Sequence, residues 1–321
     1  MKKAWKKKKI IIPILFGIVL CIAAFCYVND YYHSEECVQE YLAGNGTVSV
    51  IEIKDGLYLD GPGKDTAMIF YPGAKVEYTA YVPLLHKLAN HGIDCFLIKM
   101  PCNLAFFGQN KAGKIMNSYD YDHWYLSGHS LGGAMAASYA AGRLDKLDGL
   151  ALLAAYPTKT LASDAFSVVS IYGSEDGVLT MEKMEEGREF MPSDYTEVCI
   201  EGGNHALFGN YGSQDGDYDA SITQEEQQNQ TVAAILQMVE NHKEEQQEEY
   251  DSGHIKNAVC LPHEDILSEP EILPDKGQQI LVYCRSGNRS KQAAQKLVDM
   301  GYEKVLEFGG ILDWPYQNML E

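Results

Sequence analysis

Three polar side chains of the types used in acyl transfer each follow an apolar run. Ser130 stands in GHSLGG, directly after the run HWYL. Asp176 stands in GSEDG after SVVSIYG, and His205 stands in GGNHALFG after TEVCI. A serine hydroxyl is a weak nucleophile, so it needs a base to take its proton and a carboxylate to orient that base. These residue types, in the chain order Ser, Asp, His, predict acyl-transfer chemistry.

Each of these residues also has a purely structural interpretation. Ser130 could serve only as a helix cap, and His205 only as a surface loop residue. Asp176 could be a turn residue, with Glu175 as the acid in its place. His129, inside the same motif, is interpreted as a packing residue. Because a Gly-x-Ser-x-Gly string is common by chance, the prediction depends on all three placements agreeing.

The surrounding elements are expected to bring these residues together. Short apolar runs alternate with helical stretches, which predicts an α/β fold with a doubly wound, mostly parallel sheet covered on both faces. The first two runs, joined at Asp55-Gly56, are typical of a hairpin. The expected strands are VSVIEI, LYLDG, TAMIFY, IDCFLIKM, HWYLSG, GLALLAAY, SVVSIYG and TEVCIEG. Each of the three candidate residues then lies on a loop at the same edge of the sheet.

A closing helix is predicted from the segment TQEEQQNQTVAAILQMVENH. Its apolar residues recur at helical spacing, and they are Val232, Ile235, Leu236 and Val239. Thr223 and Glu226 form a capping-box pattern at its start. The charged run after it is interpreted as a helical extension or a linker.

The segment DGDYDASITQEE also has the acidic spacing of a calcium loop, with Asp215, Asp217 and Asp219 in ligand positions. Ala220 stands where such a loop needs glycine, and Glu226 already has the capping role. We therefore predict no metal site.

On these motifs the chain resembles the α/β-hydrolase superfamily, in particular the lidless dienelactone-hydrolase-like group often labelled carboxymethylenebutenolidase. The resemblance covers residues 48–245 and rests on GHSLGG, GSEDG and GGNHALFGNYG. It implies Ser130 as nucleophile, His205 as general base and acid, and Asp176 as the group that holds the imidazole tautomer. No cofactor is expected.

The oxyanion of such a reaction needs hydrogen-bond donors. We expect the backbone amide of Leu131 and, from the loop FYPGAKVE, that of Ala74, although the chain has Pro72-Gly73 where the family often has His-Gly.

The 45 residues between Ser130 and Asp176 leave no room for a lid domain. An open site favours a small ester, thioester or lactone. Phe106 and Phe107 are equally consistent with an acyl pocket and with ordinary packing.

A second group of reactive residues stands in ILVYCRSGNRSKQAAQKL. Cys284 ends a predicted strand, and Arg285 and Arg289 are close by, so a reactive thiolate is expected. Four residues separate Cys284 from Arg289, a spacing that favours sulfur transfer over phosphate ester cleavage. Residues 248–321 resemble a single-domain rhodanese whose front is truncated. Such a module would be either a sulfurtransferase or a docking or relic domain.

The N-terminus predicts a membrane anchor. Six lysines in residues 1–9 precede the uncharged run Ile10–Val28, which nearly spans a bilayer as a helix. The lysines place the N-terminus in the cytoplasm and the rest of the chain outside the cell membrane. A formal charge of −19 makes nucleic acid an improbable partner.

The predicted organisation is a basic cytoplasmic tail (1–9), a transmembrane signal anchor (10–28), a juxtamembrane segment (29–47), the α/β-hydrolase domain (48–241), a charged linker (242–249) and the truncated rhodanese-like domain (250–321). The predicted function is a membrane-anchored serine hydrolase acting on a small acyl substrate. Two alternatives remain: a persulfide carrier working through Cys284 beside a degenerate hydrolase domain, and a non-catalytic surface binding protein.

Overall fold

The structure is a computed structural model. It describes residues 27–163, 166–193, 195–252, 254–263, 266, 268–284 and 288–311. The predicted tail and nearly all of the predicted anchor, residues 1–26, lie outside these ranges. Within them, no helix has the length and apolar character needed to cross a membrane.

The larger, N-terminal unit is built on an eight-stranded sheet with the strand order β1-β2-β4-β3-β5-β6-β7-β8. Its strands are β1 (Ser49–Ile53), β2 (Gly56–Asp60), β3 (Thr66–Tyr71), β4 (Asp94–Ile98), β5 (His123–His129), β6 (Gly149–Leu153), β7 (Ser167–Gly173) and β8 (Thr196–Ile200). The predicted hairpin is confirmed, since β1 pairs antiparallel with β2. β2 is antiparallel to β4, and all later neighbours are parallel.

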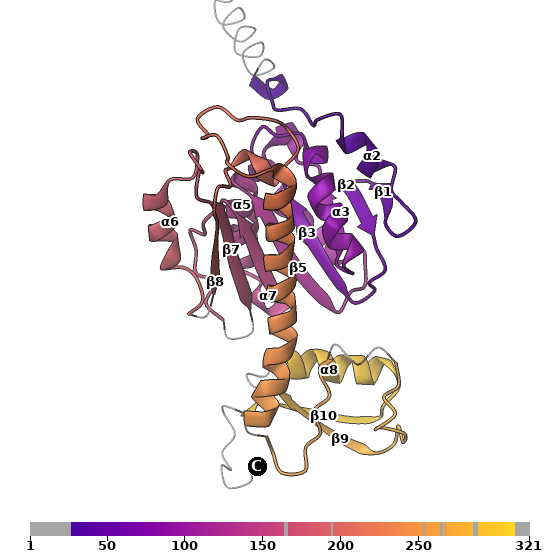
Figure 1. Cartoon of the computed structure of the whole chain (residues 1–321). Helices are drawn as coiled ribbons and strands as arrows, with labels where there is room; N and C mark the ends of the chain where they lie inside the picture. The colour runs from indigo at the N-terminus through magenta and orange to yellow at the C-terminus, as the bar shows by residue number, and fades with distance from the viewer. Residues whose placement is uncertain are drawn as a thin grey trace, which may run out of the picture.

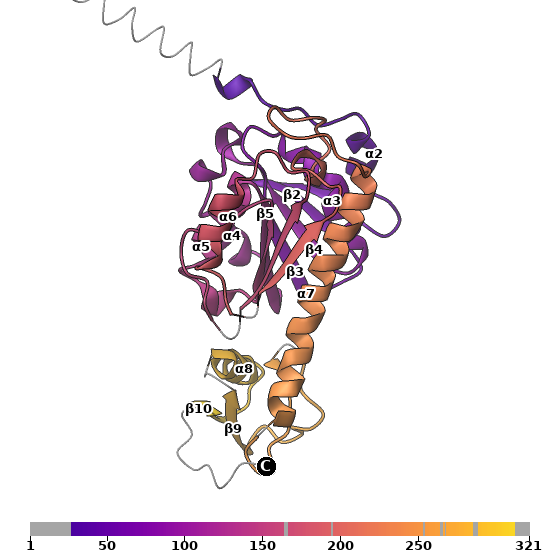
Figure 2. The same ribbon diagram turned by 60° about the vertical axis from the view of Figure 1, so that its left-hand side comes forward.

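Helices cover both faces of this sheet (Figures 1 and 2). One face carries α3 (Val82–Asn90) and α7 (Gln224–Ser252), and the other carries α4 (Lys111–Met116) and α5 (Leu131–Ala140). The shorter elements are α2 (Val38–Leu42), α6 (Met181–Arg188), η1 (Tyr78–Tyr81), η2 (Pro101–Asn103), η3 (Ala105–Phe107), η4 (Leu144–Lys146) and η5 (Ala206–Phe208). The doubly wound α/β fold is thus confirmed.

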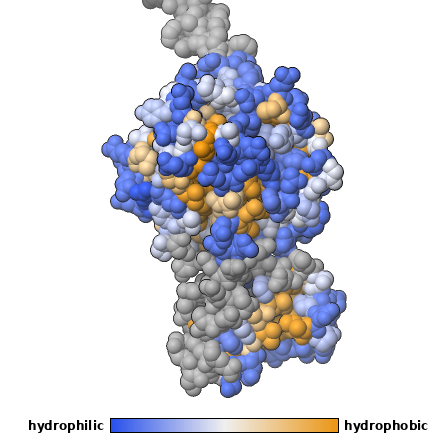
Figure 3. Space-filling model, in the orientation of Figure 1, coloured by the Kyte–Doolittle hydropathy of each residue, from blue (hydrophilic) through white to orange (hydrophobic). Residues whose placement is uncertain are grey.

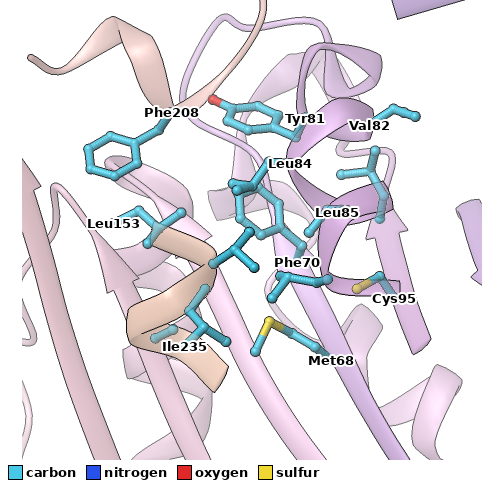
Figure 4. Packing of buried hydrophobic residues seen from close by; sticks show 14 of the residues in the cluster. Met68, Phe70, Tyr81, Val82, Leu84, Leu85, Cys95, Leu153, Phe208 and Ile235 are labelled. Atoms are coloured by element: carbon cyan, nitrogen blue, oxygen red, sulfur yellow. The ribbon is translucent and has the colours of Figure 1, made fainter. Parts of the chain in front are cut away.

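Side-chain alternation along β3 supplies both halves of the core. Met68 and Phe70 point to the side of α3 and α7, while Ala67, Ile69 and Tyr71 point to the side of α5. Figure 4 shows the first side, where Phe70 lies near Leu84 and Leu85 of α3, with Ile235 of α7 on the same side of the sheet. Burial on both faces explains why this strand reads as a continuous apolar run.

The helix α7 begins with the predicted capping box. Thr223 Oγ1 accepts the amide of Glu226 at 3.2 Å, and the Glu226 carboxylate accepts the amide of Thr223 at 2.7 Å. The buried residues Val232, Ile235 and Val239 join the core. The helix then continues through residues 242–249, so the charged run is a helical extension that leads directly into the C-terminal unit (Figures 1 and 2).

The C-terminal unit contains, in its described part, the parallel strands β9 (Gln279–Cys284) and β10 (Lys304–Gly310) and the helix α8 (Asn288–Asp299). One face of this sheet packs on α8 around Ile280, Ala293 and Leu297. The other face exposes apolar side chains, which gather over β9 and β10 in Figure 3 and include Leu281, Leu306 and Phe308.

The N-terminal unit contacts the α8 side of the C-terminal unit. Lys296 of α8 donates to the Asp122 carboxylate and to the carbonyl of His263, and the rings of His263 and His123 lie 6.4 Å apart. Asp122 and His123 mark the start of β5. The C-terminal unit therefore lies at the edge of the large sheet where β5 begins.

Candidate active site

The loops that carry Ser130, Asp176 and His205 meet at the opposite edge of the sheet. They follow β5, β7 and β8, which run parallel and end at the same side. Because parallel strands present their carboxyl ends together, side chains distant in sequence converge there. The predicted placement of all three residues at one edge is confirmed.

Ser130 occupies a strained turn between β5 and α5. Its φ of 52° and ψ of −124° lie where side chains are disfavoured, and its amide donates to the carbonyl of Leu153 at 2.9 Å. The neighbouring glycines are required by space: a Cβ on Gly132 would lie 2.1 Å from the carbonyl oxygen of Tyr71, and one on Gly128 would lie 2.6 Å from the backbone of Gly132. This is the geometry of a nucleophile elbow.

His205 is paired with Asp176. The imidazole Nδ1 lies 2.9 Å from Oδ2 of the carboxylate, and the two side chains are only 1% and 3% exposed. The other carboxylate oxygen accepts the amides of Val178 at 2.9 Å and Leu179 at 2.7 Å. The alternative acid, Glu175, instead accepts the Ser174 hydroxyl at 3.4 Å. Asp176 is therefore the carboxylate that orients the ring.

The second ring nitrogen of His205 is available to act as a base. In the neutral tautomer that donates from Nδ1 to this carboxylate, Nε2 carries the lone pair. It is buried, and among the described residues it has no hydrogen-bond partner, Ser130 Oγ included. The ring lies 4.5 Å, between centroids, from that of His129, the residue before Ser130. The imidazole thus lies beside the elbow that carries the serine.

Two backbone amides fit the predicted role of oxyanion donors. In the loop after β3, Gly73 donates to the Tyr81 hydroxyl at 3.1 Å and Lys75 donates to the carbonyl of Asn103 at 2.8 Å. Ala74, between them, has no such hydrogen bond in the described part of the chain. Leu131 is the first residue of α5, where an amide has no partner within the helix. Within the described residues, neither amide has a backbone acceptor.

Tyr81 connects the oxyanion loop to the elbow, a role that no sequence pattern indicated. Its hydroxyl lies 2.8 Å from Nδ1 of His129 and accepts the amide of Gly73. Burial, and secondarily the neighbouring His205, hold the pKa of His129 well below its usual value. His129 is therefore a neutral, buried residue, in agreement with the packing role predicted for it.

Asp217 fastens the loop of His205 to the loop of Asp176. Its Oδ1 accepts the amides of Gly177 at 3.0 Å and His205 at 3.3 Å, and its Oδ2 accepts that of Ala206 at 2.8 Å. The sequence singled it out only within a calcium-like spacing. Within the described ranges, no group of three or more His, Cys, Asp or Glu is arranged to hold a metal ion.

Gln227 of α7 forms hydrogen bonds to the same loop, at the residue before His205. Its side-chain carbonyl accepts the amide of Asn204 at 2.9 Å, and its side-chain amide donates to the carbonyl of Asn204 at 2.8 Å. The glutamine is fully buried. Its two hydrogen bonds fix the residue immediately before His205.

We expect Asp217→Ala to lower both activity and stability. Removing the carboxylate leaves four loop amides, that of Tyr218 included, without this acceptor, which should lower the free energy of unfolding by about 2 kcal/mol. Movement of His205 should lower kcat by about tenfold to a hundredfold. Denaturant unfolding and ester hydrolysis measure the two effects. Asp219→Ala, which removes an exposed carboxylate from the same loop, is the control; equal effects in both variants would contradict the assignment.

Comparison with known proteins identifies the family of the N-terminal unit. Residues 67–229, half of the chain, match the model of a family described as the alpha/beta hydrolase family. The chain belongs to the α/β-hydrolase family. Among solved structures, the hydrolase resembles mouse alpha/beta hydrolase domain-containing protein 10, at 11% identity and a TM-score of 0.47, over 61% of this chain and 99% of that one. It also resembles Est1E from Butyrivibrio proteoclasticus, at 14% identity and a TM-score of 0.42, over 60% and 99%.

The C-terminal unit of the hydrolase is a rhodanese-like domain, matched at residues 239–315. It is 34% identical over 67 residues to thiosulfate sulfurtransferase PspE of Escherichia coli, which covers 21% of this chain and 64% of that protein. It is 41% identical over 63 residues to a sulfurtransferase of Allochromatium vinosum, over 19% and 58%. The chain thus spans less than two thirds of the length of these relatives.

The second predicted site lies in this rhodanese-like domain. Cys284 ends β9 and is half-buried, and Arg289 lies in the first turn of α8. Cys284 lies at a strand end shortly before a helix, as predicted, while Arg285 and its two following neighbours lie outside the described residues. Because the domain contacts the edge where β5 begins, Cys284 and Ser130 belong to separate sites at opposite ends of the hydrolase (Figure 1).

Proposed function

We propose that the protein is a membrane-anchored serine hydrolase whose catalytic domain faces the outside of the cell. The observation that carries this proposal is the buried His205–Asp176 pair, 2.9 Å apart, whose unengaged Nε2 lies beside the elbow of Ser130. The anchor is proposed from the sequence of residues 10–28, and its orientation from the lysines before it.

In the proposed reaction, His205 Nε2 takes the proton of Ser130 as the oxygen attacks an ester carbonyl. The amides of Leu131 and Ala74 stabilise the oxyanion. The imidazolium returns its proton to the leaving alcohol, which departs as the carbon–oxygen bond breaks and an acyl-enzyme remains. Water, deprotonated by His205, then hydrolyses the acyl-enzyme and releases the acid. Asp176 stabilises the imidazolium throughout.

The absence of a lid between nucleophile and acid supports an accessible site. In the part of the chain that the structure describes, only α5, β6, β7 and their connections lie between Ser130 and Asp176. Small esters, thioesters and lactones can therefore reach the elbow directly, which makes p-nitrophenyl acetate a suitable first substrate.

Labelling with a fluorophosphonate tests the proposal most directly. The probe phosphonylates a serine, with loss of fluoride, only where a base activates the hydroxyl and amides stabilise the charge that builds on the phosphonyl oxygen during attack. The expected result is one modified peptide, containing Ser130. A protein that is folded but unlabelled, and that does not hydrolyse p-nitrophenyl acetate, would refute the proposal and favour the non-catalytic binding protein.

Sulfur transfer through Cys284 is a second candidate function, favoured by the match of residues 239–315 to the rhodanese-like domain and by the identity to sulfurtransferases. Cys284 ends β9 a few residues before the N-terminus of α8, the position of a reactive cysteine that the sequence predicted. Cys284 would take the outer sulfur of thiosulfate as a persulfide, releasing sulfite, and pass that sulfur to cyanide.

We expect Cys284→Ser to abolish any cyanide-dependent formation of thiocyanate by the full chain, a fall of at least about a hundredfold, because the serine oxygen cannot carry a persulfide. Colorimetric detection of thiocyanate measures the effect. Cys260→Ser is the matched control in the same domain. If the wild-type chain forms no thiocyanate, the docking or relic interpretation of the domain is favoured.

A further inference from the structure

The described chain begins directly beside the oxyanion loop. The ammonium of Lys75, the residue after Ala74, lies 4.8 Å from the ring centroid of Tyr27 and 2.7 Å from the Asp30 carboxylate. Tyr32 donates its amide to the carbonyl of Lys75 at 2.7 Å. The end of the predicted anchor, at residue 28, is therefore held beside Lys75, in the loop that carries the proposed oxyanion donor Ala74.

The segment after the anchor is fastened to the loops around the site. Tyr32 forms a bridge with Val76, and Glu35 donates its amide to the carbonyl of Asn210 in the loop after His205 at 2.9 Å. The Tyr32 hydroxyl accepts the amide of Asp215 at 3.1 Å. Since these bonds join the segment to two of the loops that form the site, it cannot act as a long tether that lets the domain rotate.

This attachment fixes which edge of the hydrolase faces the bilayer. Figures 1 and 2 show the start of the described chain at the end of the hydrolase opposite the rhodanese-like domain. An anchor that ends there brings the active-site edge next to the membrane and turns the rhodanese-like domain away from it.

The loops of the same edge carry exposed aromatic side chains. Phe106 and Phe107 of η3 are 67% and 59% exposed, and their ring centroids lie 5.5 Å apart. They follow Asn103, whose carbonyl accepts the amide of Lys75. The other large, exposed apolar side chains of residues 27–241 are Tyr27, Ile51, Met181 and Tyr218, of which only Ile51 lies away from the loops of this edge.

We propose that this rim, defined as Tyr27, Phe106, Phe107, Met181 and Tyr218, inserts into the membrane interface, and that the substrate is the acyl ester of an amphiphile resident in that bilayer. Aromatic side chains partition to the membrane interface. A site without a lid leaves a long acyl chain exposed to water, whereas a bilayer next to the site would keep that chain away from water. The inference rests on the proposed hydrolase function and on the proposed anchor.

The test uses the full chain reconstituted in phosphatidylcholine–phosphatidylglycerol vesicles, with p-nitrophenyl acetate as the soluble ester and 4-methylumbelliferyl oleate in the bilayer. In the double variant Phe106→Ser, Phe107→Ser, the ratio of the oleate rate to the acetate rate should fall about tenfold. The control, Val259→Ser with Ile272→Ser, removes two exposed apolar side chains of the rhodanese-like domain and should leave the ratio within twofold.

A parallel measurement does not depend on activity. With p-benzoylphenylalanine at position 107, irradiation should give a phospholipid adduct detectable by mass spectrometry, and the same group at position 272 should give none. An unchanged rate ratio, or crosslinking of position 107 to protein instead of lipid, would overturn the inference. Wild-type hydrolysis of the acetate but not of the oleate would also overturn it while leaving the hydrolase proposal intact. Absence of acetate hydrolysis would refute the hydrolase proposal itself.

Discussion

Ser130→Ala is expected to lower kcat/KM for p-nitrophenyl acetate by about 10⁴- to 10⁶-fold. The alanine has no oxygen to form the acyl-enzyme, and the elbow offers no second nucleophile. The loss should appear in kcat, because the alcohol oxygen reacts only in the chemical step. Labelling by a fluorophosphonate should disappear at the same time. Steady-state kinetics and mass spectrometry of the labelled peptide measure the two effects.

The serine variant should remain folded, since its alanine keeps the backbone of the elbow and the amide bond to Leu153. Unfolding by denaturant, followed by circular dichroism, checks this. Ser213→Ala, in the loop after His205, removes an exposed serine and serves as the matched control. Retention of more than a tenth of the activity by Ser130→Ala would mean that another residue is the nucleophile.

Asp176→Asn is expected to lower kcat by about 10³- to 10⁴-fold with little change in KM. The asparagine can present an amide N–H to Nδ1 of His205, which favours the tautomer that carries its proton on Nε2. A protonated Nε2 cannot take the proton of Ser130, although the ring stays in place. The comparison of kcat with KM therefore separates a tautomer effect from a loss of substrate binding.

Glu175→Gln provides the control for Asp176→Asn, because it neutralises the adjacent carboxylate, which does not pair with His205. We expect it to retain activity within about threefold. If Glu175→Gln lowers kcat more than Asp176→Asn does, then Glu175 is the carboxylate that orients His205 in solution. Glu175 is the alternative acid proposed from the sequence.

The sequence by itself determined the fold class and the three loops of the site. Apolar runs separated by amphipathic helices specify a mostly parallel sheet, and the carboxyl ends of its parallel strands lie at one edge. Ser130, Asp176 and His205 each follow a strand directly, so their meeting follows from local order along the chain. The same holds for the capping box of Thr223 and Glu226, because both partners lie within one helical turn.

The tertiary structure alone decided which groups hold the site in place. Asp217 accepts amides from two loops, one of which lies 40 residues away, and Gln227 reaches back 23 residues to Asn204. A buried amide can be satisfied by any acceptor that the fold brings near it, so such a contact leaves no periodic signature in the sequence. The attachment of Tyr32 to the oxyanion loop and the exposure of Phe106 likewise depend on how distant loops pack, which no local pattern records.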